Sequence, residues 1–136
     1  MKAHQTFPDR EVTEKIIAAF TREALPRARK KGAIKHDEQV RILRDELSAA
    51  GFHVYQPGKP GMTNRAKRIG TYKIDLVVDH TYAIIVKFTK TVPYSHRIRL
   101  KGALQSMELP TGFIFNFGYS EKIIYRVDVE DPKGAD

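Results

Sequence analysis

Two apolar segments separated by three polar residues constrain the fold more than any other feature of this sequence. The first runs from Thr71 to Val78 and the second from Tyr82 to Phe88, with Asp79-His80-Thr81 between them. Both are rich in β-branched and aromatic residues, and the short polar link is typical of a hairpin turn. We therefore expect two adjacent, largely buried strands. Asp75 stands inside the first of them, where a charged side chain is costly without a partner.

The rest of the chain alternates between helical and strand patterns. In chain order we expect a helix that Pro26 ends or kinks, a second helix that Gly51 ends, a short strand at 52–56, the hairpin, a helix at 95–107, and two final strands at 113–117 and 122–129. This α-α-β-β-β-α-β-β order predicts an α/β or α+β domain with a mixed central sheet flanked by helices. One domain is expected over residues 1–130, followed by a flexible tail at 131–136.

The charge of the chain points to a polyanionic partner. The 136 residues carry a formal net charge of +8, and such an excess attracts nucleic acid, although a basic surface also serves solubility alone. Cysteine is absent, which excludes disulfides and thiolate metal sites. No apolar run reaches the length of a signal peptide or a membrane span. We expect a soluble, cytoplasmic protein without a membrane partner.

Four motifs follow one another in an order that we recognise. They are the helical segment 13–20, the strand Gly70-Thr71-Tyr72-Lys73-Ile74-Asp75-Leu76-Val77-Val78, His96 at a helix start, and Gly112 followed by Asn116-Phe117-Gly118. With these motifs the chain resembles the GxxExxY family, a branch of the PD-(D/E)XK nuclease superfamily, over nearly its whole length. The resemblance implies a restriction-endonuclease-like fold.

The chain also departs from the pattern of that family at the positions that carry chemistry. Asp75 and Lys87 match the first acid and the lysine, but Ile85 stands where the second acid belongs. Arg99 replaces a glutamine of the family. In the Gly-x-x-Glu-x-x-Tyr signature, His36 falls at the Glu position and Gln39 at the Tyr position, and a slip of one or two residues brings in Asp37 or Glu38 instead.

The missing acid argues against the metal chemistry that the resemblance implies. Mg²⁺ takes oxygen ligands, and family members hold it with two carboxylates beside the lysine. We expect Asp75 and Lys87 to be the remnant of an inactive catalytic site, with no cofactor. If the domain is active, it is a metal-dependent nuclease with Mg²⁺ on Asp75 and a migrated acid. Glu38 or Asp37 is the first candidate for that acid and Asp79 the second, against a solvated helix face and a turn residue as the simpler interpretations.

Basic residues border the remnant site on two segments. They are Arg65, Lys67, Arg68 and Lys73 before the Asp75 strand, and Arg97, Arg99 and Lys101 in the following helix. Such residues grip phosphates with little sequence preference. Tyr72, Tyr82, Tyr94 and Phe113 either stack on unpaired bases or pack within the sheet. Asp75 itself has a structural interpretation, an ion pair with Lys87 or Lys73.

The sequence therefore favours a catalytically degenerate nuclease-like domain that binds DNA, RNA or a nucleoprotein partner through a basic surface. The alternative is a self-assembly or protein-interaction module, because the apolar final strands would form a homo-oligomer if one of them lies at a sheet edge. The second alternative is the active Mg²⁺-dependent nuclease described above.

Overall fold

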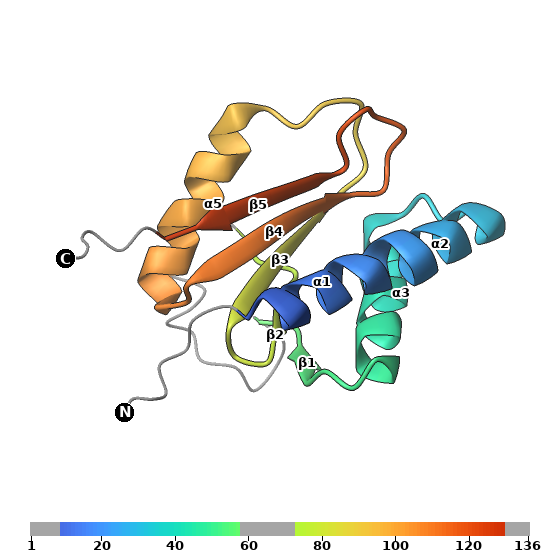
Figure 1. Cartoon of the computed structure of the whole chain (residues 1–136). Coiled ribbons are helices and arrows are strands. Elements are labelled where there is room, and N and C mark those ends of the chain that lie inside the picture. Colours follow the sequence, from blue (N-terminus) through green and yellow to red (C-terminus); the bar gives the residue numbers. More distant parts are fainter. Residues whose placement is uncertain (1–8, 58–72, 130–136) are drawn as a thin grey trace.

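A five-stranded mixed sheet separates two layers of helices (Figure 1). This computed structural model describes residues 9–57 and 73–129. The strands are β1 (Val54–Tyr55), β2 (Leu76–Val78), β3 (Tyr82–Lys87), β4 (Thr111–Asn116) and β5 (Ile124–Asp128), in the spatial order β1-β2-β3-β4-β5. Only β3 and β4 run parallel; the other neighbours are antiparallel. The predicted fold class is confirmed.

The predicted hairpin is present, with a shorter first strand than expected. Asp79 and His80 form its turn with positive φ angles of 51° and 52°, the handedness that suits a two-residue hairpin connection. The strand expected at 71–78 begins at Leu76 among the described residues, so Asp75 lies just before β2 and not inside it. The basic loop residues Arg65, Lys67 and Arg68, together with Tyr72 and the tail at 131–136, lie outside the described residues.

The first helical segment is longer than predicted. It comprises α1 (Arg10–Ala18), the π-helical turn η2 (Ala19–Ala24) and α2 (Leu25–Lys31), and Asp9 caps it by accepting the Glu11 N–H at 2.8 Å. Pro26 does not end the helix, because it lies in the first turn of α2, where a missing N–H is tolerated. The wider π turn before it also relieves the contact between the proline ring and the preceding turn. The basic residues 27–31 are therefore helical and not a loop.

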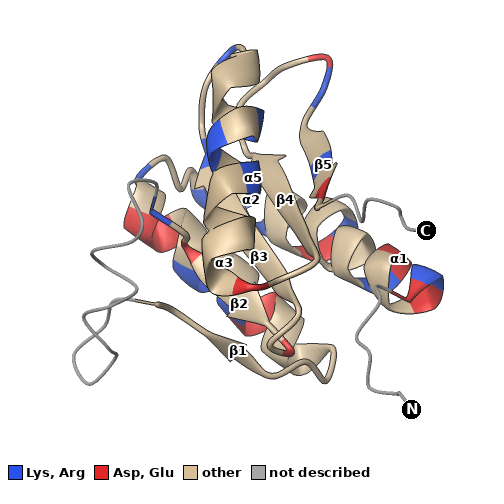
Figure 2. Cartoon of the chain, turned by 90° about the vertical axis from the view of Figure 1, so that its left-hand side faces the viewer, with Lys and Arg blue, Asp and Glu red and all other residues tan. Residues whose placement is uncertain are grey.

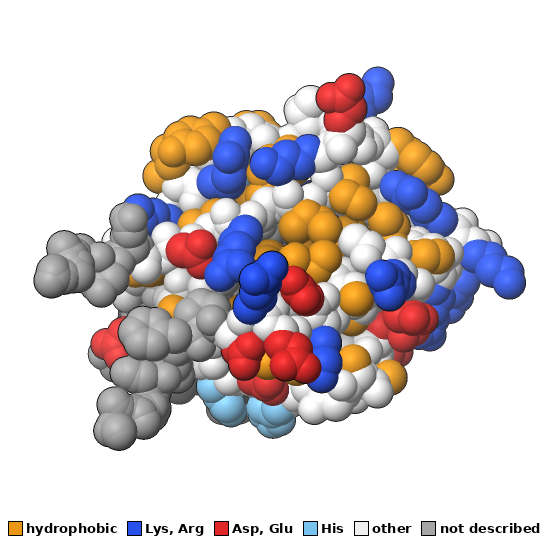
Figure 3. Space-filling model, in the orientation of Figure 1, with side chains coloured by type: hydrophobic (Ala, Val, Ile, Leu, Met, Phe, Trp, Pro, Cys, Tyr) orange, Lys and Arg blue, Asp and Glu red, His pale blue; other side chains and the backbone are white. Residues whose placement is uncertain are grey.

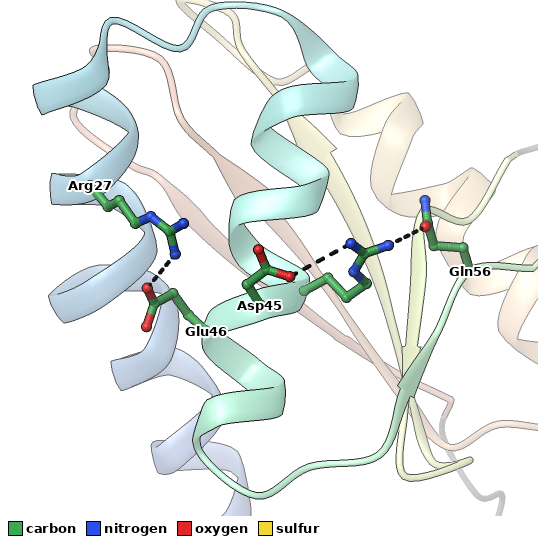
Figure 4. A network of polar contacts seen from close by, with 5 residues as sticks. Arg27, Asp45, Glu46 and Gln56 are labelled. Carbon is green, nitrogen blue, oxygen red and sulfur yellow. Dashed lines mark hydrogen bonds and ion pairs between the residues drawn. The ribbon is translucent and has the colours of Figure 1, made fainter.

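Polar contacts fix α3 (His36–Ala49) between its neighbours (Figure 4). Arg27 of α2 pairs with Glu46 of α3 at 2.8 Å. Arg44 donates to Gln56 at 3.0 Å and lies 3.6 Å from Asp45, which ties the middle of α3 to the segment after β1. Gly51 has a φ of +99° and turns the chain from α3 towards β1, as predicted for a helix stop.

Each face of the sheet has its own apolar core. On one face, α1 to α3 cover residues such as Ile84 and Phe115, and Phe20 stacks on Phe115 with a ring separation of 4.4 Å. On the other face, α5 (Tyr94–Met107) covers a second cluster through Leu100, Ala103 and Leu104. None of the helices in the described ranges is both long and apolar enough to cross a bilayer.

Candidate functional site

Asp75 is held against the neighbouring strand β3 by two backbone contacts. Its N–H donates to the Ile84 carbonyl at 3.0 Å, and its Oδ2 accepts the N–H of Val86 at 2.7 Å. The side chain is only 6% exposed. The carboxylate therefore takes the place of a carbonyl at the point where the regular β2–β3 ladder begins, which satisfies a buried N–H.

The second oxygen of Asp75 faces the start of α3. His36 Nε2 lies 3.1 Å from Asp75 Oδ1, while His36 Nδ1 lies 3.7 Å from the fully exposed carboxylate of Asp37. Burial raises the pKa of Asp75 above its ordinary value, and the Val86 N–H, His36 and Lys73 oppose that rise. Both oxygens of Asp75 are thus occupied by groups of the chain itself.

Ile85, at the position of the missing acid, belongs to the core on the α5 face. It is 2% exposed and packs in the cluster that contains Val77, Leu100 and Ile114. A side chain in this environment supplies packing free energy and no lone pair. The position at which the resemblance places a second acid therefore lies in the apolar core.

Lys87 ends β3 and lies close to the start of α5. It is half-buried and paired in register with Asn116 of β4, and its carbonyl accepts the Phe117 N–H at 2.7 Å. Partial burial lowers the pKa of His96, and the positive charges of Lys87 and Arg99 lower it further. Lys87, His96 and Arg99 therefore share one electrostatic environment.

The other basic residues of α5 differ in their surroundings. The Arg97 guanidinium lies 4.7 Å from the Tyr94 ring centre and 5.1 Å from that of Tyr125, so it is half-buried between two aromatic rings. Its Nε is buried without a hydrogen-bond partner among the described residues. Arg99 and Lys101 are exposed. Of the stacking candidates named above, Tyr94 is exposed, whereas Tyr82 and Phe113 are buried in the sheet.

The alternative acidic ligands are dispersed over the described structure. Glu38 is half-buried in the first turn of α3 and Asp37 points into solvent. Asp79 lies in the turn at the opposite end of β2 from Asp75, where its Oδ1 accepts the His53 N–H at 2.9 Å. Over residues 9–57 and 73–129 no three His, Cys, Asp or Glu side chains gather closely enough to hold a metal ion.

Asn116 and Gly118 have a structural role that the sequence analysis did not identify. The buried Asn116 amide oxygen accepts the N–H groups of Thr89 and Gly118, and its amide nitrogen donates to the Thr89 carbonyl at 3.0 Å. A Cβ on Gly118 would stand 2.4 Å from that carbonyl. The Asn-Phe-Gly motif thus joins the ends of β3 and β4, and the signal that points to it is an Asn two residues before a Gly at a strand end.

The five-stranded mixed sheet with helices on both faces is consistent with a restriction-endonuclease-like fold. A family model of the PD-(D/E)XK nuclease superfamily matches residues 31–127, and the chain belongs to this superfamily. Comparison with curated proteins and with solved structures gave no match.

The residues present do not fit the Mg²⁺ ion that active members of this superfamily usually employ. Mg²⁺ prefers several oxygen ligands and one or two carboxylates. Here the Asp75 carboxylate is buried and accepts the Val86 N–H, and Ile85 offers no lone pair. The side chain 3.1 Å from Asp75 is His36, a nitrogen ligand better suited to other metals.

Proposed function

We propose that this chain is a catalytically degenerate nuclease-like domain that binds the phosphate backbone of DNA or RNA through the basic residues of α5 and those beside it. The proposal extends the superfamily assignment to a specific activity. Its main support is charge: Lys73 acts on the buried Asp75, Lys87 and Arg99 act on His96, and α5 carries further cations. The basic residues concerned are Lys73, Lys87, Arg97, Arg99 and Lys101.

The basic residues are unevenly distributed over the molecule. From Tyr94 to Met107 helix α5 contains three basic residues and no Asp or Glu, and it stands at the front of Figure 2 with blue segments and no red. On the face seen in Figure 3, Lys and Arg side chains are instead interspersed with acidic and apolar ones. A surface of one sign attracts a polyanion more strongly than a mixed surface does.

The pairing of Asp75 with His36 supports the same proposal. Asp75 is buried and burial raises its pKa, so it adds little negative potential to the surface. Arg99, in place of the family's glutamine, adds a positive charge that a phosphate can contact directly. The replacement of the second acid by Ile85 removes a further negative charge. All three features favour phosphate over a divalent cation.

Fluorescence anisotropy with labelled single- and double-stranded DNA and RNA tests this function. Titrations at ~50 mM and ~200 mM salt, each with Mg²⁺ or EDTA, are expected to show binding that weakens steeply with salt and leaves the probe intact. R99A/K101A removes two exposed charges and is expected to lower the slope of log affinity against log salt by about 2.

K30A/K31A is the matched control, because it removes the same charge from exposed positions on α2, on the other face of the sheet. Equal losses in both double variants would contradict a site on α5. A folded protein that binds no probe at either salt would contradict nucleic-acid binding and favour the protein-interaction alternative. Mg²⁺-dependent cleavage that disappears in D75A would contradict the loss of catalysis.

A further inference from the structure

We propose that β5 pairs antiparallel with β5 of a second copy of this chain, in a symmetric dimer centred on Val127. Among the described residues β5 is the outermost strand beyond β4, with five residues, whereas the opposite edge strand β1 has two. A strand of this length at a sheet edge presents a row of backbone groups that another strand can pair with.

The β4–β5 ladder identifies which backbone groups face outward. The Val129 N–H donates to the Pro110 carbonyl, and the Ile123 carbonyl accepts the Asn116 N–H. Residues with odd numbers in this strand therefore bond to β4. Because bonding alternates along an antiparallel strand, Ile124, Arg126 and Asp128 direct their N–H and C=O groups away from β4.

The side chains of the outward-bonding residues select one register. Arg126 and Asp128 are both exposed and lie 3.1 Å apart on one face of β5. In a twofold pair centred on Val127, Arg126 of each copy lies opposite Asp128 of the other. Centring on Arg126 places two arginines opposite each other, and centring on Asp128 places two aspartates opposite each other. Opposite charges stabilise a cross-strand pair and like charges destabilise it, so of these three registers only the Val127 one pairs opposite charges.

The symmetry has a consequence for the basic surface. The twofold axis of an antiparallel edge pairing is perpendicular to the sheet, so each face of one copy continues into the same face of the other. Helix α5 packs on the face that carries Tyr125 and Val127. The two α5 helices of the dimer therefore lie on one side of a continuous ten-stranded sheet, each beside the axis.

Sedimentation equilibrium over a range of protein concentrations tests the dimer without nucleic acid. The expected mass rises from the monomer value of 15.5 kDa towards twice that value. R126D and D128R each create like-charge pairs across the axis and are expected to stay monomeric, while R126D/D128R restores opposite charges and the doubled mass. K31D, an equal charge change on exposed α2, is expected to dimerise. A wild type that is folded by circular dichroism and monomeric at all concentrations would overturn the proposal.

Cysteine cross-linking tests the register, because the chain has no cysteine of its own. Val127 would face its own copy in a non-hydrogen-bonded pair, with Cα atoms about 4.5 Å apart, a separation that a disulfide spans. V127C is therefore expected to form a covalent dimer under mild oxidation by diamide, while R126C and D128C do so far more slowly. Faster cross-linking of R126C or D128C would overturn the Val127 register. Equal rates in all three would indicate random collisions and overturn the pairing itself.

Discussion

At the scale of single residues, Asp75 and Ile85 both contribute to the hydrogen bonding and packing of the nuclease-like fold. Asp75 accepts the Val86 N–H and lies 3.1 Å from His36, so it completes the hydrogen bonding between the segment before β2 and strand β3. Ile85 is buried among apolar side chains. Each of the two positions therefore contributes to the stability of the fold, whatever its role in catalysis.

Ile85→Glu is expected to destabilise the fold and to leave the protein without nuclease activity. Its carboxylate would enter the cluster of Val77, Leu100 and Ile114, and an uncompensated buried charge costs about 3 kcal/mol or more. Urea unfolding followed by circular dichroism measures the change, with Ile85→Val, expected to cost about 0.5–1.5 kcal/mol, as the control. Near-wild-type stability of I85E, with Mg²⁺-dependent cleavage that is lost in D75A/I85E, would instead mean that only one ligand is missing.

Asp75→Asn is expected to change how stability depends on pH. Burial raises the pKa of Asp75 in the folded state, so above the ordinary carboxyl pKa the folded state holds a proton that the unfolded state releases. The free energy of unfolding therefore falls as pH rises through that window, by at most about 1.4 kcal/mol per pH unit. D75N lacks this titration, so its stability relative to the wild type is expected to increase as pH rises above the ordinary carboxyl pKa of 3.8.

Urea unfolding at successive pH values provides the measurement for D75N. The groups facing the carboxyl are His36, Lys73 and the Val86 N–H. They oppose the rise in the pKa of Asp75 and so narrow the pH range over which stability changes. Glu121→Gln, at an exposed position between β4 and β5, is the control. It measures how removal of one surface charge changes the free energy of unfolding, and this change is subtracted from that of D75N. If the free energy of unfolding of D75N relative to the wild type instead decreases with rising pH, the fold favours the ionised form of Asp75.

At the scale of elements, the junction between β3 and β4 is fixed by one side chain. The Asn116 side chain accepts the N–H groups of Thr89 and Gly118 and donates to the Thr89 carbonyl. This contact anchors the chain between the end of β3 and the start of α5. The Asn-Phe-Gly motif, which contributes to the family resemblance, is therefore explained by backbone packing.

Gly118→Ala is expected to destabilise the protein by about 1–3 kcal/mol, because the added Cβ would stand 2.4 Å and 2.8 Å from backbone atoms of Thr89. Gly102→Ala is the matched control. It lies inside α5 with open space around its Cβ position and is expected to stabilise the helix by about 0.5–1 kcal/mol. Thermal unfolding of both variants measures the contrast. Equal effects would mean that the Thr89 backbone moves aside at little cost.

At the scale of the whole molecule, the two proposals are connected through α5. The proposed dimer places two basic helices on one face, so a single nucleic-acid strand or duplex can contact both. Binding to the second helix is then intramolecular, which raises affinity without any new contact. The oligomeric state and the affinity for nucleic acid are therefore expected to change together.

Arg126→Asp is expected to weaken nucleic-acid binding more than K31D, an equal charge change on α2. Its direct effect on phosphate contacts is small because Arg126 faces the side of the sheet opposite α5. Anisotropy titrations of R126D and K31D, at concentrations where the wild type is dimeric, measure the difference. Equal affinities of these two variants would show that each α5 binds independently.

Much of the element order was predictable because it depends on local patterns. The hairpin follows from two apolar runs around Asp79-His80-Thr81, and the α3 stop follows from Gly51. The prediction that Pro26 ends or kinks the first helix follows from the helical hydrogen bond that proline removes, whereas in the structure it occupies the first turn of α2, where that bond is not required. The shortness of β2 could not be predicted, since it depends on where pairing with β3 begins.

The sequence by itself determined the fold class, the superfamily and the absence of an acid at position 85, since these depend on residue types and their order. Only the tertiary structure decided which groups occupy Asp75, that Ile85 lies in the core under α5, and that β5 forms a sheet edge with Arg126 and Asp128 on it. The physical reason is that burial, hydrogen-bond partners and edge position all arise from contacts between segments far apart in the chain, and a local pattern does not specify those contacts.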